Sequence, residues 1–586
     1  MRILFLTRSF NGLAQRLYLE LTARGHEVAI EYDIADAVTV EAVALWRPAL
    51  VVAPFLQRAI PEAVWRHTVC LVVHPGIVGD RGPSALDWAI ADGVPAWGVT
   101  VLQAEAEMDA GPVWASRDFP MRETTKSSLY RQEVTEAAAQ AVVQAVQHFA
   151  ATGAPPPRPA APAGTGGGRW RALMTQAERA IDWQQDDTHT VLRKVRAADG
   201  VPGVRDELFG RPCHLFDVHA VPRPPDADWS PGQVVGRRHE ALLRATRDGL
   251  VAIGHLRRAD EPGHFKLPAT LAFPAESAAL AAWPASVADG TDPDIRLEAA
   301  GDGVLALHFG FYNGAIATAQ CERLRAALQH VLAQPPRVLV LFGGSDFWCN
   351  GIHLNVIEAA DSPADESWRN INAIDDLTQT LIEATGCLVI AAMQGSAGAG
   401  GVFLALAADA VWARPGVVLN PHYKNMGNLY GSEYWTYLLP RRPGPPSTAA
   451  VMGRRLPLSA HQAQALGLLD EVFGETAATF RAEVLARARE LARSAGLPAR
   501  LQAKRLRREQ DEAAKPLAAY RVEELARMRR NFYGFDPSYH IARSNFVRRV
   551  APSWTPRHLA IHRDPARSGE TTPAATLDQD QVSGRV

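Results

Sequence analysis

The feature that most constrains the fold of this chain is the alternation of short apolar runs with helical or glycine-rich segments. In residues 1–150 the apolar runs are RILFLT, VAIEY, ALVVAPF and CLVVHPG, each about as long as a strand. Strands that alternate with helices predict an open, mostly parallel α/β sheet. The pattern returns after residue 303, where RVLVLFGG and CLVIAAMQG each lead into a glycine-rich turn. We therefore expect a multidomain α/β protein.

Changes in composition divide the 586 residues into units. The length suits roughly three or four domains of about 150 residues each. The segment ATGAPPPRPAAPAGTGGG cannot pack or hold regular structure, which predicts a linker. The expected units are an α/β domain (1–150), the linker (151–168), a small β-rich subdomain (169–258), a connector (259–293), a second α/β domain with a helical C-terminal region (294–562) and a disordered tail (563–586).

Composition excludes several classes of protein. The formal net charge of -2 gives no general attraction to nucleic acid or to a membrane surface. No window approaches 18 uninterrupted apolar residues, so we expect no membrane span. The 5 cysteines include no CxxC pair, which argues against a disulfide framework and a thiolate zinc site. We expect a cytoplasmic protein that uses no metal.

The first candidate site follows the strand CLVVHPG. In open α/β sheets ligands bind beyond the carboxyl ends of the strands, where His74 lies. Pro75 ends the strand, and Gly76 is the first of several glycines that let the backbone approach a ligand. Asp109, in the later stretch EMDAGPVW, could share proton transfer with His74. The alternative is a structural histidine and an ordinary Asp-Ala-Gly turn.

These residues resemble a known family. The strings VVHPG, GDRGPSALDWAI and MDAGPVW are similar to the catalytic domain of formyltransferases that use 10-formyltetrahydrofolate. AIDWQQ and KVRAADGVPGVRD resemble the small barrel-like C-terminal subdomain of the same enzymes. The resemblance implies that His74 and Asp109 assist formyl transfer. The residues that it implies for folate binding are Asn11, Leu56, Arg81, Gly82 and Ser84.

One departure from the formyltransferases concerns the acceptor of the formyl group. The family usually has an asparagine two residues before the histidine, where it helps to bind the oxyanion, and this chain has Val72. An amine acceptor must lose a proton before it attacks, whereas a thiol ionises near pH 8.5. Val72 therefore puts an amine acceptor in doubt and is compatible with a thiol.

The second candidate site lies in the stretches VLFGGSDFWCNGIHL and MQGSAGAGGVFLALAADAVWA. Small residues between a strand and a helix expose backbone N–H groups at the helix N-terminus. Two such N–H groups aimed at one point form an oxyanion hole. The alternative is that the small residues only allow a helix to pack closely on a sheet.

The two stretches, in this order, resemble the crotonase (enoyl-CoA hydratase/isomerase) family over about residues 303–474. The resemblance implies that the N–H groups of Ile352 and Gly400 hold the carbonyl of a CoA thioester. The other residues that it implies for CoA binding are Trp348, Asn350 and Gly398.

The positions of the two hydratase glutamates again depart from the family. They correspond here to Phe403 and to either His422 or Tyr423. Phenylalanine cannot activate water, so enoyl-CoA hydration is not expected. The stretch PHYKNMGNLYGSEYW instead offers Tyr423 and Glu433 as candidates for proton transfer. The alternative is that its tyrosines are core aromatics.

The combination of both sites is similar to the HypX/HoxX family of hydrogenase maturation factors over nearly the whole chain. That resemblance implies formyl transfer from 10-formyltetrahydrofolate to the thiol of coenzyme A, and then cleavage of formyl-CoA into carbon monoxide and coenzyme A. It implies hydrogenase maturation proteins as partners. An internal path that lets the pantetheine arm reach both sites is a further expectation. The alternatives are a formyltransferase with another acceptor, and a CoA-binding scaffold without activity.

Overall fold

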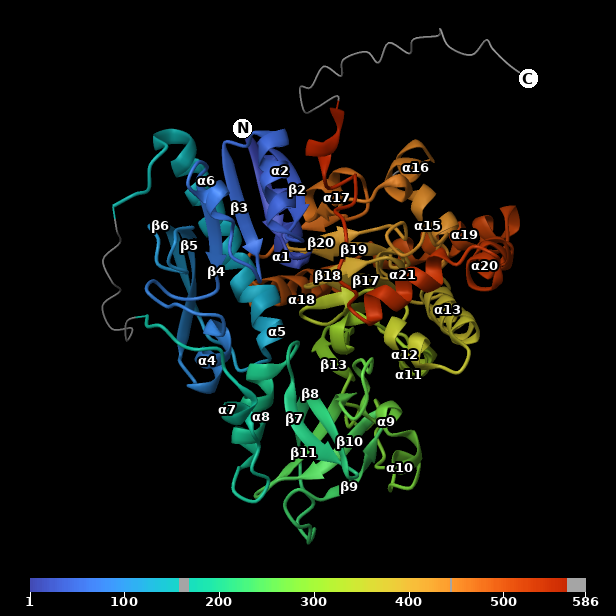
Figure 1. Cartoon of the computed structure of the whole chain (residues 1–586). Helices are drawn as coiled ribbons and strands as arrows, with labels where there is room; N and C mark the ends of the chain where they lie inside the picture. The colour runs from blue at the N-terminus through green and yellow to red at the C-terminus, as the bar shows by residue number, and fades with distance from the viewer. Residues whose placement is uncertain (158–167, 443–444, 566–586) are drawn as a thin grey trace, which may run out of the picture.

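The computed structural model describes residues 1–157, 168–442 and 445–565. Three bodies follow one another along the chain: a domain with a sheet at the N-terminus, a domain with a second sheet below it in the view of Figure 1, and a large C-terminal α/β domain. Most of the predicted linker (151–168) and of the predicted tail (563–586) lies outside the described residues.

The N-terminal sheet has the strand order β2-β1-β3-β4-β5-β6. Strands β1 to β4 are parallel, whereas β5 and β6 are antiparallel to their neighbours. The sheet is therefore mostly parallel, as predicted, and is mixed because the single strand β5 runs against both of its neighbours, β4 and β6. The bounds are β1 Arg2–Thr7, β2 Glu27–Tyr32, β3 Leu50–Phe55, β4 Cys70–His74, β5 Ala96–Gln103 and β6 Val113–Pro120.

A long helical segment closes this domain. It starts as α5 (Lys126–Leu129), continues as one turn of π-helix, η1 (Tyr130–Val134), and ends as α6 (Thr135–Thr152). Helix α6 packs its alanine-rich face on β5, β6 and α1. The other helices of the domain are α1 Gly12–Ala23, α2 Asp36–Trp46, α3 Glu62–Trp65 and α4 Ala85–Ala91.

The middle domain is an antiparallel sheet, in agreement with the β-rich unit expected from the sequence. Its order is β7-β8-β11-β10-β9, and β12 pairs with β11. The strands are β7 Val204–Leu208, β8 Arg211–Val221, β9 Val234–Arg238, β10 Ala241–Ala245, β11 Leu250–Arg258 and β12 Leu267–Pro268. The helices are α7 Gln176–Arg179, α8 Thr188–Ala198, α9 Ala269–Ala272 and α10 Pro274–Ala278.

The C-terminal domain contains two sheets. The larger has the order β13-β14-β15-β17-β19-β22 and the smaller the order β16-β18-β20-β21. The strands are β13 Ile295–Gly301, β14 Val304–Phe309, β15 Val338–Phe342, β16 Phe347–Cys349, β17 Leu388–Met393, β18 Ser396–Gly398, β19 Ala410–Ala413, β20 Val418–Asn420, β21 Leu458–Ser459 and β22 Glu471–Val472.

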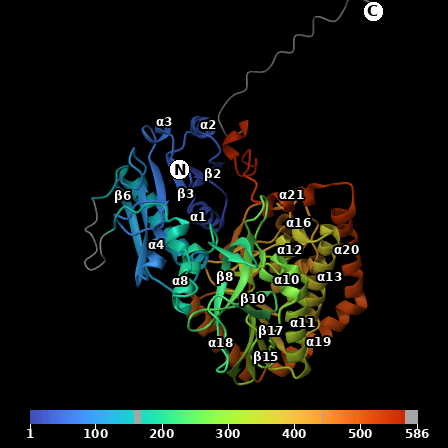
Figure 2. The same cartoon turned by 60° about the horizontal axis from the view of Figure 1, so that its bottom comes forward.

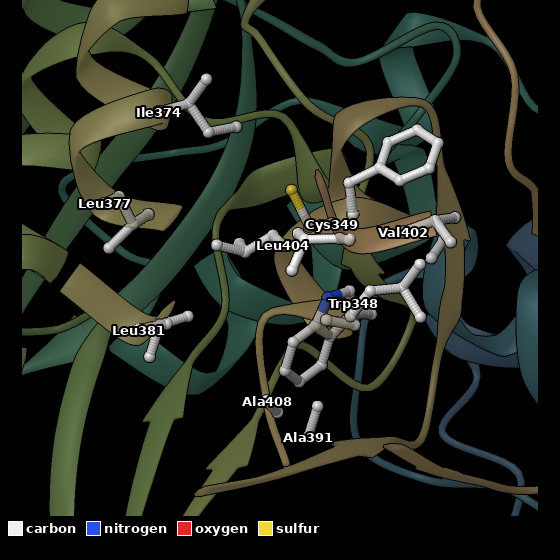
Figure 3. Packing of buried hydrophobic residues seen from close by; sticks show 14 of the residues in the cluster. Trp348, Cys349, Ile374, Leu377, Leu381, Ala391, Val402, Leu404 and Ala408 are labelled. Atoms are coloured by element: carbon white, nitrogen blue, oxygen red, sulfur yellow. The ribbon is translucent and has the colours of Figure 1, made fainter. Parts of the chain in front are cut away.

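Helices surround both sheets (Figure 2), and the last long ones, α18 to α21, form the helical C-terminal region predicted from the sequence. Figure 3 shows how apolar residues of α13 and α14 meet β16 and β17 in the core between the sheets. The helices are η2 Tyr312–Gly314, α11 Thr318–Ala333, α12 Leu354–Ala359, α13 Pro363–Ile382, α14 Gly400–Leu406, α15 Trp435–Leu438, η3 Leu439–Arg441, α16 Pro445–Gly453, α17 Ala460–Ala465, α18 Ala477–Arg493, α19 Leu497–Ala514, α20 Leu517–Tyr533, α21 Ser538–Val547 and η4 Ile561–Arg563.

The last described segment of the chain returns to the N-terminal sheet, beside α2 and β2 in Figure 1. Ile30 N donates to Leu559 O at 3.0 Å, so the edge strand β2 has a backbone partner outside its sheet. His562 contacts the buried carboxylate of Glu31 at 2.9 Å. The first and last parts of the described chain are therefore packed together. None of its helices is long and apolar enough to cross a bilayer.

Candidate active sites

His74 is the last residue of β4 and is buried at the carboxyl edge of the parallel strands. Its Nε2 lies 3.0 Å from Oδ2 of Asp80, a buried carboxyl in the following glycine-rich loop. Gly76 makes this contact possible, because a Cβ there would collide with His74 Nε2 and lie 2.6 Å from Asp80 Oδ2. The loop therefore fixes the imidazole against a carboxylate.

Asp109 approaches His74 from the opposite side of the ring. Its Oδ1 lies 3.7 Å from His74 Nδ1, and its Oδ2 accepts a hydrogen bond from Gly82 N at 3.1 Å. Asp109 adopts a positive φ of 56°. Because β5 runs antiparallel to β4, the connection to β6 starts at the far edge of β4 and must fold back to bring Asp109 here. The predicted pair does meet.

The residues predicted to bind folate follow β1, β3 and β4, whose carboxyl ends share one edge of the sheet. Asn11 caps α1 by accepting from Ala14 N at 3.0 Å. Leu56 directly follows β3 and packs partly buried against the core. Arg81 pairs with Glu107 at 2.5 Å, and Ser84 Oγ accepts from Met174 N at 3.1 Å.

Asp80 was not predicted as a partner of His74. It lies only six residues after the histidine, in the loop GDRGPS, whose resemblance implied folate binding. The sequence did contain a signal for this contact, because Asp80 lies between two glycines shortly after the strand-end histidine. Val72, two residues before His74 on the same face of β4, is partly buried against an apolar cluster and offers no polar group.

In the second site, the two predicted backbone donors lie on adjoining turns. Gly400 is the first residue of α14, so its N–H has no acceptor within the helix. A Cβ on Gly351 would lie 3.4 Å from Gly400 N, and Ile352 is the next residue. Two backbone donors that converge on one region can hold a carbonyl oxygen.

Glu433 faces this turn and is 1% exposed. A Cβ on Gly400 would collide with Glu433 Oε1 and lie 3.0 Å from Oε2. Oε2 accepts hydrogen bonds from Tyr423 OH at 2.5 Å and from Ser432 N at 3.1 Å. Burial, and after it the nearby Asp375 carboxyl, raises the pKa of Glu433 to about 8. The site thus has a carboxyl that exchanges a proton near neutral pH.

Tyr423 lies between Glu433 and the ring of Phe403. The two aromatic rings stack with centroids 5.7 Å apart and planes 18° apart. Burial and the neighbouring Glu433 charge raise the pKa of the Tyr423 hydroxyl well above its usual range. The hydroxyl therefore keeps its proton and donates a hydrogen bond to Glu433, and the carboxyl is the group that can serve as a base.

The remaining residues predicted for CoA binding have different surroundings. Trp348 is 2% exposed in the core shown in Figure 3, and its indole N–H donates to Gly401 O at 3.0 Å. Asn350 Nδ2 donates to Asn313 O at 2.9 Å, and a Cβ on Gly398 would lie 3.2 Å from Asn350 Oδ1. The Trp348 side chain is occupied in the core, so only its backbone can contribute to a ligand site. Asn350 and Gly398 are next to each other.

Sequence reasoning missed two further buried carboxyls near Glu433. Asp375, on α13, accepts from Glu433 N at 2.8 Å. Glu524, on α20, accepts from Tyr434 N at 3.0 Å and from Thr436 N at 2.8 Å. Each sits in an acidic pair on a helix, Asp375 beside Asp376 and Glu524 beside Glu523, and no local pattern links either one to residues 432–436.

Profiles of known families match the three domains separately. The formyl transferase family matches residues 26–146, the formyl transferase C-terminal domain matches residues 173–262, and the enoyl-CoA hydratase/isomerase family matches residues 311–554. The methionyl-tRNA formyltransferase of Ralstonia nicotianae is 25% identical over 242 residues, 41% of this chain and 72% of that protein.

A full-length relative decides the family. The hydrogenase maturation factor HoxX of Bradyrhizobium diazoefficiens is 54% identical over 564 residues, 96% of this chain and 97% of that protein. This chain belongs to the HoxX/HypX family of hydrogenase maturation factors. The crystal structure of HypX from Aquifex aeolicus in complex with tetrahydrofolic acid is similar with a TM-score of 0.92 and 46% identity, covering 96% of this chain and 99% of that one.

HoxX/HypX membership explains the domain order. A formyltransferase domain, its C-terminal subdomain and an enoyl-CoA hydratase/isomerase domain are fused in one chain, as the sequence patterns predicted. Both parts are enzyme families, so the chain is an enzyme.

Proposed function

We propose that this enzyme makes carbon monoxide for hydrogenase maturation in two steps. The N-terminal site moves a formyl group from 10-formyltetrahydrofolate to the thiol of coenzyme A, and the C-terminal site cleaves formyl-CoA. The observation that carries the proposal is Glu433, a buried carboxyl of raised pKa beside the N–H of Gly400, in a domain whose hydratase position holds Phe403.

The first step uses the His74 pair. His74 takes the proton of the attacking thiol, while Asp80 and Asp109 on either side stabilise the positive charge on the ring. When the tetrahedral intermediate collapses, His74 returns the proton to the leaving nitrogen of the folate. Tetrahydrofolate bound to HypX from Aquifex aeolicus, which covers 96% of this chain, supports folate as the donor.

The second step breaks two bonds of the formyl group. The N–H groups of Ile352 and Gly400 hold the formyl oxygen. Glu433 takes the formyl hydrogen as a proton, the electrons of that C–H bond remain on carbon, and the C–S electrons leave with sulfur. Carbon monoxide escapes, and the proton on Glu433 returns to the thiolate, so coenzyme A is regenerated.

The residues present fit these substrates. At the second site Gly400 carries no side chain, so the Glu433 carboxyl can lie close to the turn that offers the N–H groups to a thioester carbonyl. Phe403 and Tyr423 close the side where hydratases hold water-activating glutamates, which favours loss of carbon monoxide over hydration. At the first site Val72 places no amide beside the oxyanion, which is compatible with a thiol acceptor.

The test is to incubate the purified protein with 10-formyltetrahydrofolate, with and without coenzyme A, and to detect carbon monoxide by the absorbance of a haem protein. Gas that forms only with coenzyme A supports both steps. Formyl-CoA without gas would overturn the second step. Folate consumption with an amine acceptor and no coenzyme A would favour another acceptor, and no reaction at all would favour a scaffold.

A further inference from the structure

Residues Ser432, Glu433 and Tyr434 form a strained and fully buried segment. Glu433 and Tyr434 have positive φ values of 59° and 57°, although neither is glycine. L-residues avoid this region because Cβ comes too close to the backbone, so the surrounding contacts must hold the segment in place.

Two carboxyls from distant helices make those contacts. Asp375 Oδ1 accepts from Glu433 N at 2.8 Å, and Glu524 Oε2 accepts from Tyr434 N at 3.0 Å. Glu524 Oε1 also accepts from both the N–H and the hydroxyl of Thr436, at 2.8 and 2.5 Å. The backbone on both sides of the Glu433 Cα is therefore anchored by carboxylates.

Ser432 joins the two anchors. Its Oγ lies 2.8 Å from Asp375 Oδ2 and 3.3 Å from Glu524 Oε2. A hydroxyl has a single proton to donate, so Ser432 makes two full hydrogen bonds when one of the two carboxyls carries a proton and donates it to Oγ. The geometry therefore suits a proton shared between Asp375 and Glu524.

The charged groups around Asp375 and Glu524 are compatible with a shared proton. Among the described residues no lysine, arginine or histidine forms an ion pair with Asp375, Glu433 or Glu524, and Arg521 pairs instead with Asp376 at 2.5 Å. Burial raises the pKa of Asp375 to about 6 and that of Glu524 to about 8, the latter helped by Asp375. The other groups that face the cluster are Tyr423, Tyr430, Tyr434, Cys321 on α11, Cys349 on β16, and Asp376 and Arg521 near Asp375.

We infer that Asp375 and Glu524 are positioning residues that hold Glu433 against the Gly400 turn and keep a shared proton beside it through Ser432. The inference rests on the proposed function of Glu433. It gives the C-terminal helical region a role in the chemistry, because α20 contributes Glu524 from about ninety residues further along the chain.

The experiment supplies formyl-CoA directly to the full-length protein, so that the first site is bypassed, and follows carbon monoxide release as a function of pH. Asp375→Asn keeps an oxygen for Glu433 N and removes the like charge. We expect the pH of half-maximal rate to fall by ~1 unit.

Glu524→Gln places an amide group among N–H donors, and Ser432→Ala removes the hydroxyl that bridges Asp375 and Glu524. Both variants should lower kcat ~10-fold with little change in KM.

Glu523→Gln is the matched control, because Glu523 is exposed on the same helix and pairs only with Lys515 among the described residues. It should leave the rate and the pH profile unchanged. Formyl transfer from 10-formyltetrahydrofolate in each variant checks that the protein is folded.

The outcomes separate the inference from the proposed function. If the unmodified protein releases no gas from formyl-CoA, the proposed function fails. If it does, but Asp375→Asn keeps the original pH midpoint, or Glu524→Gln and Ser432→Ala keep the original kcat, the inference fails. Should Asp375→Asn not fold, the other two variants decide.

Discussion

The two candidate sites solve one problem, proton transfer near neutral pH, in different ways. The N-terminal site uses His74, a residue type that commonly serves as a general acid or base, and places a carboxylate on each side of it. The C-terminal site uses Glu433, a residue type that is ordinarily ionised, and brings its pKa up by burial beside other carboxyls. The first arrangement needs two loops within one domain, whereas the second needs helices from distant positions in the chain.

The largest expected effect of a single change is at the first site. His74→Ala should lower formyl transfer to coenzyme A by ~10³-fold, because general acid–base catalysis contributes about that much. It should leave release of carbon monoxide from added formyl-CoA intact. His67→Ala, at an exposed position, is the control. A loss below tenfold would mean that His74 is structural.

Glu433→Gln should have the reverse effect. We expect formyl-CoA to accumulate while carbon monoxide release falls by ~10²-fold or more, because an amide cannot accept the formyl proton. Tyr423→Phe removes one hydrogen bond to the carboxyl and should cost only ~10-fold. Chromatography of the acyl-CoA pool measures both. If Tyr423→Phe were the more damaging change, the roles assigned to the two residues would be wrong.

The pH dependence should separate the sites further. Because the pKa of Glu433 is raised to about 8, its basic form grows as the pH rises toward that value. Carbon monoxide release from formyl-CoA should therefore increase ~10-fold per pH unit below pH 7 and level off above about pH 8. A release rate that falls with rising pH would show that Glu433 acts as an acid in the slow step.

Each site also depends on one glycine that leaves room for the reactive side chain. Gly76→Ala should displace His74 from Asp80, and Gly400→Ala should displace Glu433 from the N–H turn. We expect each to lower its own reaction ~10-fold while the other reaction stays unchanged. Gly12→Ala, where an added Cβ meets no atom within 4 Å, is the control for both.

The smallest effect concerns stability. A buried carboxyl whose pKa is raised stabilises the folded state at low pH and loses that contribution as the pH rises through about 8. The glutamine of Glu433→Gln cannot ionise. The Tm of this variant minus that of the unmodified protein should therefore increase by about a few degrees as the pH rises from 6 to 9. A Tm difference that is constant with pH would indicate that Glu433 is not protonated in the folded protein.

The sequence by itself determined much of this protein. The alternation of apolar runs and glycine turns was enough for the α/β class, the β-rich middle domain and the position of His74 at a strand end, since these depend on local periodicity and turn chemistry. The strings around His74 and Gly400 also indicated the two families. The reversed direction of β5 was not predicted, because strand direction depends on how a connection crosses the sheet.

Only the tertiary structure decided which charges surround the reactive groups. Asp80 meets His74 because Gly76 leaves space for the ring, and Asp375 and Glu524 meet Glu433 because α13 and α20 pack against residues 432–436. Nothing local in α13 or α20 distinguishes these carboxyls from solvated ones. Burial and proximity set a pKa, and both are properties of the packed chain.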